Sequence, residues 1–271
     1  SFDAPGANVN PRVIKNYDGS NIILNEEYQM DPIKFPVLNE VIGDDLVVTD
    51  GNTLLGADDK SGIAIIMQLL QEILNDKSFL HNDIYICFTP DEEIGRGVDH
   101  FNYDYFKVDF AYTLDGGQVG SIEMENFNAA SAKVTTIGKS IHPGSAKDQL
   151  INAIKLATEF NSNLPKDEVP EHTEMYEGFY HLTSISGSVE LATLEYIIRD
   201  HDMDSFKKRK ELFETIKDKL NEKYGYEAFK VELKDQYYNM ATYLEDKMYI
   251  VDLAKKAITD SGLEPVTLPI R

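Results

Sequence analysis

The sequence predicts an α/β fold in its first part and a ferredoxin-like α+β domain in its second part. Short apolar runs and a helical pattern alternate up to about residue 125, which favours a sheet with helix crossovers. From about residue 126 the predicted elements follow the order β-α-β-β-α-β, which is the order of a ferredoxin-like domain. One more helical pattern follows these elements.

The first part is expected to contain three short strands and one long helix. The strands correspond to apolar runs at residues 46–49, 84–88 and 110–114. The helix is expected over residues 60–77, because apolar side chains recur there at three- and four-residue spacing. These side chains are Ile63, Ile66, Met67, Leu70, Ile73 and Leu74.

The second part is expected to contain four strands and two helices, followed by a third helix. The strands are expected at residues 132–137, 180–185, 192–198 and 229–233. The helices are expected at residues 149–161, 205–224 and 247–261. The first of these helices has one apolar face. We expect it to end before Pro165, because proline cannot continue a helix.

Composition limits the partners that this chain can have. Its 271 residues include 47 acidic and 26 basic side chains, for a formal net charge of −21. Nucleic acids and anionic membranes select basic surfaces, so we expect neither as a partner. No apolar run approaches the roughly 20 residues of a membrane-spanning helix, and no signal peptide is visible, so a cytoplasmic location is expected. The single cysteine, Cys87, lies in an apolar strand pattern and is expected to be a buried thiol.

Three acidic motifs follow or flank apolar runs, and each has glycine nearby. They are Asp58-Asp59, Glu92-Glu93 and Asp115. Neighbouring side chains on an extended segment point to opposite sides, so one glutamate of the pair can face a metal while the other faces a water on that metal. Carboxylates at the ends of three elements indicate a site for a hard or borderline cation that activates water.

Each motif also has a simpler explanation. A pair such as Glu92-Glu93 is often a solvated turn, Asp58-Asp59 can cap the helix that follows, and Asp115 before two glycines can belong to a turn. The context shared by the three motifs favours the metal site. The sequence contains no phosphate loop, no Gly-x-Gly-x-x-Gly after a strand and no Gly-x-Ser-x-Gly.

Several stretches of the chain match the signature blocks of a known family. They are Leu55-Gly-Ala-Asp-Asp-Lys-Ser-Gly62, Phe88-Thr-Pro-Asp-Glu-Glu-Ile-Gly95, Tyr112-Thr-Leu-Asp-Gly-Gly117, Asn16-Tyr-Asp-Gly-Ser-Asn-Ile22, Glu125-Asn-Phe-Asn-Ala-Ala130, His142-Pro-Gly144 and Tyr176-Glu-Gly-Phe-Tyr180. They resemble the blocks of peptidase T, the tripeptide aminopeptidase branch of the dizinc M20 metallopeptidases. The resemblance covers essentially the whole chain.

The resemblance implies a mixed-sheet metallopeptidase domain with helices on both faces, plus an inserted ferredoxin-like α+β lid/dimerisation domain. It places the catalytic domain at residues 1–125 and 238–271, and the lid/dimerisation domain at residues 126–237. Tripeptide substrates are implied, and so is a homodimer that forms through the lid domain.

The resemblance also assigns roles around the metals. Asp58 matches the aspartate that bridges the two metals, and Glu93 and Asp115 match terminal ligands, one on each metal. Glu92 matches the general base that takes a proton from the attacking water. These roles follow from the resemblance and not from spacing or composition.

Three further residues match substrate-binding positions of the family. His142 matches a histidine of the smaller domain that reaches over the substrate, although alone, before Pro143-Gly144, it fits a surface turn. Arg199 matches an arginine of that domain linked to substrate binding, and Arg271 matches an arginine that precedes a glycine-rich substrate loop.

The chain also departs from the family pattern. The alignment places a His-x-Asp block just before Ser1 and a Gly-Gly-Thr-Asp-Gly block just after Arg271, with a final histidine ligand further on. The chain is therefore expected to be an internal fragment whose catalytic domain is truncated at both ends. We expect two zinc ions per full-length subunit, and weak or absent zinc binding by the fragment.

The sequence thus predicts a zinc-dependent aminopeptidase that releases the N-terminal residue from tripeptides, by metal-activated water with a glutamate general base. Another M20-type peptidase or deacylase, such as a dipeptidase or a carboxypeptidase, would share Asp58, Glu92, Glu93 and Asp115. A different alternative for the fragment is a catalytically inactive interaction module. Histidine ligands beyond the two ends of the chain would favour the enzyme.

Overall fold

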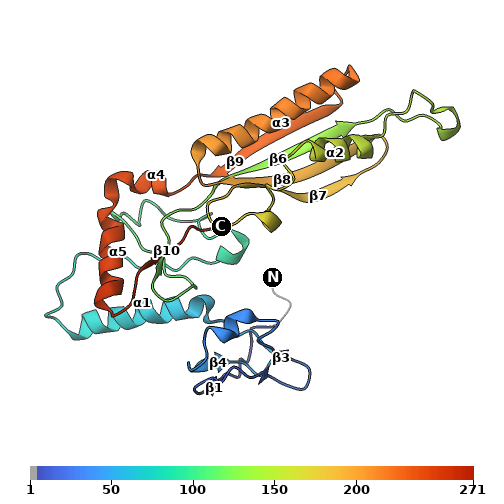
Figure 1. Ribbon diagram of the computed structural model, residues 1–271. Coiled ribbons are helices and arrows are strands. Elements are labelled where there is room, and N and C mark those ends of the chain that lie inside the picture. Colours follow the sequence, from blue (N-terminus) through green and yellow to red (C-terminus); the bar gives the residue numbers. More distant parts are fainter. Residues whose placement is uncertain (1–4) are drawn as a thin grey trace. The chain divides into compact units, whose positions relative to one another are not determined.

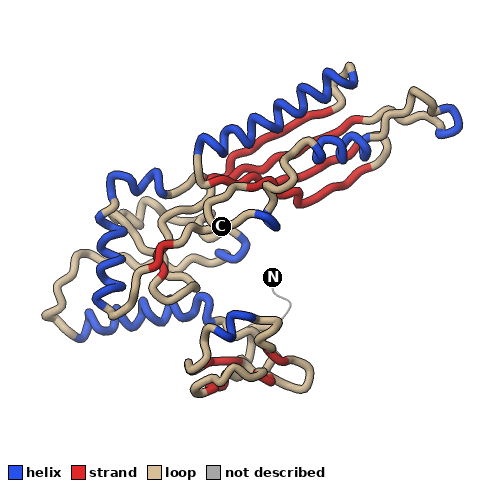
Figure 2. The backbone as a smooth tube through the Cα atoms, viewed as in Figure 1, coloured by secondary structure: helices blue, strands red, loops and turns tan. Residues whose placement is uncertain are grey.

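The structure is a computed structural model that describes residues 5–271, and of Glu93 it describes the backbone only. The chain divides into two compact units, Ser1–Gly117 and Gln118–Arg271. Figures 1 and 2 show the helices and strands of each unit, and the fold is mixed α/β as predicted. Within residues 5–271, no helix combines the length and the apolar character needed to cross a membrane. The boundaries expected for the catalytic and lid domains stay predictions.

The first unit begins with two small antiparallel ladders around an apolar cluster. β1 (Arg12–Ile14) pairs with β4 (Leu46–Val48), and β2 (Ile22–Ile23) pairs with β3 (Gln29–Met30). The cluster consists of the buried side chains of Tyr17, Ile22, Leu38 and Val48. β4 confirms the strand predicted at residues 46–49.

A long helix, α1 (Ala57–Asn75), follows these ladders and confirms the helix predicted at residues 60–77. Asp58 and Asp59 have dihedral angles outside the helical region, so the regular helix begins at Lys60. The Asp59 carboxylate accepts a hydrogen bond of 3.0 Å from the backbone N–H of Gly62. This bond satisfies one of the N–H groups that the first turn of a helix leaves unpaired.

The strands predicted at residues 84–88 and 110–114 are wrong, because both runs are loops in the structure (Figure 2). Cys87 is exposed, so the prediction of a buried thiol is also wrong. An apolar run shows that a segment favours burial, but a strand also needs a neighbouring backbone that completes its hydrogen bonds. Neither run pairs with another strand in the described part of the chain.

The second unit contains the predicted ferredoxin-like arrangement. In chain order it consists of β6 (Asn128–Ile137), α2 (Ala153–Ser162), β7 (Phe179–Gly187), β8 (Leu191–Asp200), α3 (Met203–Tyr224) and β9 (Phe229–Tyr237). The four strands form one antiparallel sheet in the order β7-β8-β6-β9. The predicted β-α-β-β-α-β order is therefore confirmed.

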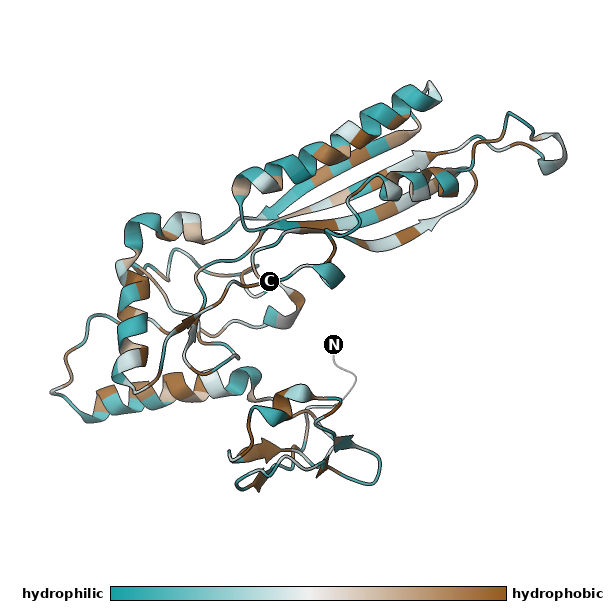
Figure 3. Cartoon of the chain, in the orientation of Figure 1, coloured by the Kyte–Doolittle hydropathy of each residue, from teal (hydrophilic) through white to brown (hydrophobic). Residues whose placement is uncertain are grey.

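The core of this unit lies between the sheet and its two helices, which cover the same face (Figure 1). Side chains alternate along the strands, so one face carries apolar residues and the other carries polar ones (Figure 3). Arg209 of α3 donates hydrogen bonds to Asp200 and Glu168, and its guanidinium lies over the ring of Tyr180. The charge of this mostly buried arginine is thereby paired with two carboxylates.

The remaining helices and strands belong to the same unit. α4 (Ala241–Leu244) precedes α5 (Tyr249–Asp260), which confirms the helix predicted at residues 247–261. β10 (Val266–Thr267) pairs in parallel with β5 (Ser121–Ile122), and Ile270 donates a backbone hydrogen bond of 2.8 Å to Glu125. The end of the chain thus lies beside the segment that leads into β6.

Candidate metal centre

Three carboxylates meet at the N-terminal end of α1 in the first unit. Asp58, Asp59 and Asp115 each offer one oxygen, and these oxygens all lie within 4.8 Å of one another. Asp58 and Asp115 are exposed, and Asp59 is partly buried. The structure thus brings together two of the residues that the sequence analysis selected, Asp58 and Asp115, although they are far apart along the chain.

Close backbone approaches hold these carboxylates in place. A Cβ atom added to Gly116 would lie 3.1 Å from the carboxylate carbon of Asp58, so the chain after Asp115 passes close to the start of the helix. The backbone N–H of Gly116 also donates a hydrogen bond of 2.7 Å to the Asp115 carboxylate. This bond agrees with a turn at Asp115, which the sequence analysis gives as the simpler explanation for this residue.

The donor set of this cluster fits a divalent cation. Carboxylate oxygens so close to one another repel, and a bound cation removes that repulsion. Oxygen donors suit hard and borderline ions such as Mg²⁺, Mn²⁺ and Zn²⁺. The chemistry of the three side chains therefore agrees with the cation site that the acidic motifs predict.

Asp59 is a member of this cluster that the sequence analysis did not select as a ligand. The sequence analysis includes Asp59 in the acidic motif Asp58-Asp59 and gives a helix cap as its simpler explanation, and Asp59 does accept the hydrogen bond from Gly62. A carboxylate has two oxygens, so one side chain can cap a helix and also face a cation. The signal in the sequence was the adjacent pair of aspartates at the predicted start of a helix.

The structure corrects the prediction that Glu92 and Glu93 lie on an extended segment at the end of a strand. Both residues lie in a 3-10 turn, Glu92–Ile94, flanked by Asp91 and Gly95 in the left-handed region at φ of 62° and 69°. The alternation of side chains along an extended strand therefore does not apply to them. The Glu92 side chain is exposed and is not part of the aspartate cluster, and the Glu93 side chain lies outside the described part of the chain.

His142 lies in the second unit, at the start of the 3-10 turn Pro143–Ser145. Its Nδ1 atom accepts a hydrogen bond of 3.1 Å from the backbone N–H of Gly144, which leaves Nε2 as the protonated nitrogen of the neutral ring. The side chain is exposed. This placement agrees with the turn that the sequence predicts there.

The two predicted substrate-binding arginines both bind backbone carbonyls in the second unit. Arg199 of β8 donates to Ile198 at 2.9 Å and to Ala130 at 3.3 Å, and its guanidinium lies 5.5 Å from the centre of the Tyr237 ring. Arg271 donates to the carbonyls of three residues and to one hydroxyl: Thr173 (both groups), Met175 and Glu177.

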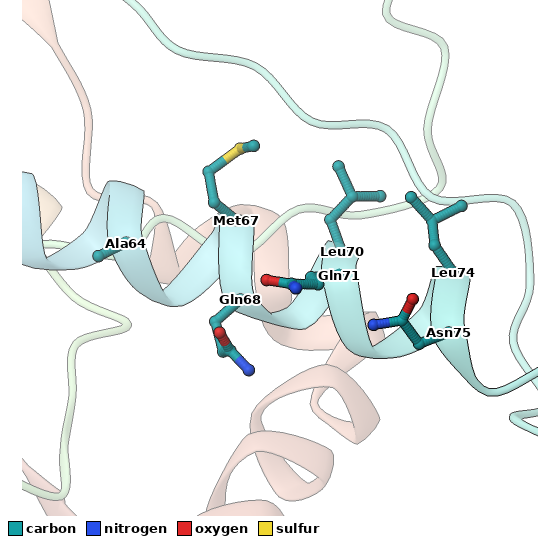
Figure 4. A pocket seen from close by; sticks show the side chains of 7 residues that line it. All are labelled: Ala64, Met67, Gln68, Leu70, Gln71, Leu74 and Asn75. Atoms are coloured by element: carbon teal, nitrogen blue, oxygen red, sulfur yellow. The ribbon is translucent and has the colours of Figure 1, made fainter.

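Two shallow hollows in the structure are less suited than the aspartate cluster to bind a metal or to catalyse a reaction. One, of about 380 Å³, follows α1, and Figure 4 shows Met67, Leu70 and Leu74 projecting from the same side of this helix. Its other lining residues are Ala64, Gln68, Gln71 and Asn75, so it has no carboxylate, thiol or imidazole. The other, of about 600 Å³, lies on the sheet of the second unit. Its lining includes two lysines and two glutamates, so it has no net charge: Lys133, Lys234, Glu195 and Glu232.

Two families of known proteins match parts of this chain. The family described as "Peptidase dimerisation domain" matches residues 124–227, and the family described as "M42 glutamyl aminopeptidase" matches residues 41–170. The first match covers the β-α-β-β-α unit of the antiparallel sheet. The second covers Asp58, Asp59, Asp115 and the Glu92-Glu93 turn.

Curated relatives match the chain over nearly its whole length. Peptidase T of Clostridium perfringens (strain 13 / Type A) is 54% identical over 99% of this chain. Peptidase T of Clostridium novyi (strain NT) is 49% identical over 99%, and that of Caldanaerobacter subterraneus is 50% identical over 100%. The chain spans 66% of the length of the first relative and 67% of the other two.

Two solved structures share the fold. The aminopeptidase PepT from Bacillus cereus ATCC 10987 has a TM-score of 0.67 and 24% identity, over 82% of this chain and 60% of that one. A tripeptidase from Staphylococcus aureus has the same TM-score and 25% identity, over 82% of this chain and 59% of that one.

Proposed function

Because this chain belongs to the peptidase T family, we propose that the whole protein is a metal-dependent aminopeptidase that releases the N-terminal residue of tripeptides. The observation that carries the proposal is the 48–54% identity to several peptidase T proteins over nearly the entire chain. Support also comes from the three convergent carboxylates of Asp58, Asp59 and Asp115.

The proposed cofactor is a pair of zinc ions, which the carboxylates of Asp58, Glu93 and Asp115 would hold. Bound zinc lowers the pKa of water and polarises the scissile carbonyl. Glu92 is proposed to accept a proton from the attacking water and to return it to the leaving amine. His142 and Arg199 are proposed to bind the substrate.

The experiment uses the full-length natural protein, with its metal removed by a chelator and then restored. Restoring zinc should restore the release of the first residue from a tripeptide, followed by chromatography of the products. The same tripeptide with an acetylated N-terminus should resist cleavage, because an aminopeptidase binds the free amine. Release of the C-terminal residue instead, or of an acyl group, would assign the chain to a carboxypeptidase or deacylase.

A second candidate specificity comes from the match of residues 41–170 to the family described as "M42 glutamyl aminopeptidase". A protein with that specificity would prefer peptides that begin with glutamate. Tripeptides that differ only in their first residue separate the two candidates, because a general tripeptidase accepts apolar and acidic first residues alike.

A homodimer in the cytoplasm is the proposed assembly and location. The match of residues 124–227 to the "Peptidase dimerisation domain" supports the dimer and the assignment of residues 126–237 as the lid/dimerisation domain. Sedimentation of the full-length protein tests the dimer, and fractionation of cells tests the location. A monomer at all concentrations up to about 100 µM would contradict a stable dimer, because it would limit the free energy of dissociation to under about 5.5 kcal/mol.

A further inference from the structure

Aspartate is followed directly by glycine at three places in this chain, Asp18-Gly19, Asp50-Gly51 and Asp115-Gly116. In such a pair the backbone nitrogen of glycine can attack the side-chain carbon Cγ of aspartate, because glycine has no side chain that shields its nitrogen. The product is a five-membered cyclic imide, and water reopens it to aspartate or to isoaspartate, in which the main chain runs through Cγ. The three pairs have the same chemistry, so the folded geometry decides which of them reacts.

The geometry at Asp115 favours this reaction. The backbone N–H of Gly116 donates a hydrogen bond of 2.7 Å to Oδ1 of Asp115. Because Oδ1 is bonded to Cγ, this contact places the glycine nitrogen beside the carbon that it would attack. Both residues are exposed, in a segment that belongs to no helix or strand. Water can therefore reach an imide at this position.

The aspartate cluster itself requires a glycine after Asp115. A Cβ atom at position 116 would lie 3.1 Å from the carboxylate carbon of Asp58, a distance that is tight for two carbon atoms. The close approach of Gly116 to Asp58 thus depends on the absence of a side chain. The same absence leaves the backbone nitrogen of Gly116 unshielded.

Asp18 is held in a geometry that opposes the reaction. Its Oδ1 atom accepts a hydrogen bond of 3.0 Å from the backbone N–H of Ser20, two residues further on. Hydrogen bonds from the side chain and the backbone of Ser20 also lower the pKa of the Asp18 carboxyl below its usual value. Imide formation expels one oxygen of the carboxyl group, and this oxygen leaves more readily from the protonated acid. The bonds to Ser20 therefore slow the reaction at Asp18.

Asp50 is restrained on both sides of the bond that would form. Its Oδ1 atom accepts a hydrogen bond of 3.0 Å from the backbone N–H of Asn52, and Oδ2 accepts one of 3.3 Å from the Asn10 amide. The bond from Asn52 lowers the pKa of the Asp50 carboxyl. The N–H of Gly51 donates to the Thr49 hydroxyl at 3.2 Å. The glycine nitrogen of this pair is therefore bound to a group other than the Asp50 carboxylate.

We propose that Asp115-Gly116 is a site of spontaneous isoaspartate formation, and that a divalent cation bound to the aspartate cluster slows this reaction. In the first step the bond between the Gly116 nitrogen and Cγ of Asp115 forms. The carboxyl group loses a hydroxyl and the nitrogen loses its proton, which leave together as water. In the second step water adds to the main-chain carbonyl carbon of Asp115 and breaks its bond to the nitrogen. The atoms balance without any other reagent.

The reaction and the cation act against one another at Asp115. In isoaspartate the carboxylate is attached directly to Cα and the main chain is one methylene longer. The carboxylate is thereby moved from the position at which Asp115 meets Asp58 and Asp59 within 4.8 Å. A cation bound to the Asp115 carboxylate holds the oxygen that would leave. This protective effect rests on the metal site of the proposed function, whereas the reaction of the metal-free protein does not.

The test uses the full-length natural protein, incubated at neutral pH and physiological temperature. One sample is metal-free, a second contains excess zinc, and a third is unfolded in urea. Isoaspartate at each Asp-Gly pair is measured over time by digestion and mass spectrometry with electron-transfer fragmentation. Asp115→Glu prevents closure of a five-membered ring at this position, and Asp18→Glu is the matched control.

In the metal-free folded protein, isoaspartate should form at Asp115 at least about threefold faster than at Asp18 or Asp50. Each hydrogen bond that must open first lowers the reactive population by a factor of about 2–10. In urea the three rates should become similar, because the folded geometry is lost. Zinc should slow the reaction at Asp115 and leave Asp18 unchanged. Asp115→Glu should abolish the signal at this position, and Asp18→Glu should leave that signal intact.

Three results would overturn the inference. A rate at Asp115 that does not exceed the rates at Asp18 and Asp50 in the folded protein would mean that the contact with Gly116 does not promote the attack. The same ranking in urea would assign the difference to local sequence and not to geometry. An equal rate at Asp115 with and without zinc would remove the protective effect. None of these measurements requires cleavage of a peptide, so a protein without peptidase activity would refute the proposed function and leave this inference to be decided by isoaspartate alone.

Discussion

Asp58 and Asp59 show how two adjacent residues of one type can have different positions in a site. Both contribute an oxygen to the cluster with Asp115, and Asp59 also caps the first turn of α1. Gly62 makes this possible, because it is buried and a Cβ atom there would lie 2.5 Å from an oxygen of Asp59. The geometry of the cluster thus depends on a residue that offers no side-chain ligand to a cation.

Replacing Gly62→Ala should therefore displace the Asp59 carboxylate. Overpacking of this kind destabilises folding by about 1–3 kcal/mol. Zinc binding to the full-length protein should weaken as well, which calorimetry measures alongside urea unfolding. Gly6→Ala is the control, since a Cβ atom at Gly6 has open space around it. Unchanged stability and zinc affinity in Gly62→Ala would show that Asp59 can move without consequence.

Replacing Glu92→Gln tests the proposed base. The amide keeps the size of the side chain but cannot accept the proton, so turnover of a tripeptide should fall by about 10²–10⁴-fold while bound zinc is retained. Metal content by atomic emission and kcat by product chromatography give the two readouts. Glu26→Gln, at an exposed position, is the matched control. Near-normal turnover by Glu92→Gln would remove this residue from the mechanism.

At the scale of elements, α3 shows how local sequence determines a helix end. Asp202 accepts a hydrogen bond of 2.8 Å from the backbone N–H of Ser205, and Gly225 ends the helix in the left-handed region at φ of 73°. The hydrogen bond from the Ser205 N–H lowers the pKa of the Asp202 carboxyl below its usual value. The cap is therefore made by the charged form of the side chain.

Removing this cap with Asp202→Ala should cost about 1 kcal/mol of folding stability at pH 7. Because the folded-state pKa is lowered, the contribution of the charge is present above the unfolded value of about 3.9 and is lost as pH falls through the lower folded value. The difference between wild type and Asp202→Ala in urea unfolding should therefore shrink below about pH 4. Asp202→Asn, which caps without titrating, is the control and should remain near wild type at pH 7.

At the scale of the whole molecule, the apolar core of the second unit is continuous and local in sequence. Its buried members run from Ala130 to Phe229, and they include Phe160 and Phe213, whose rings lie 5.7 Å apart. All of them lie within residues 126–237. A domain that contains its own core can fold alone.

Residues 118–240, expressed alone, should therefore fold cooperatively. Circular dichroism should show mixed helix and strand content, and urea should unfold the segment in a single transition. Phe213→Ala in the same segment should destabilise it by about 3–5 kcal/mol, because it removes a fully buried ring. A broad transition without a plateau would mean that this core needs the rest of the chain.

Local patterns in the sequence determined much of the secondary structure of this protein. Helical spacing predicted α1 and α2, because residues three and four positions apart share one face of a helix, and short strand-like runs predicted the four strands of the antiparallel sheet. Only the tertiary structure decided that residues 84–88 and 110–114 are loops, since strand pairing depends on a distant backbone. It also decided that Asp59 joins Asp58 and Asp115, and that Arg271 binds a turn almost a hundred residues earlier, because contacts between distant segments leave no periodic trace in the sequence.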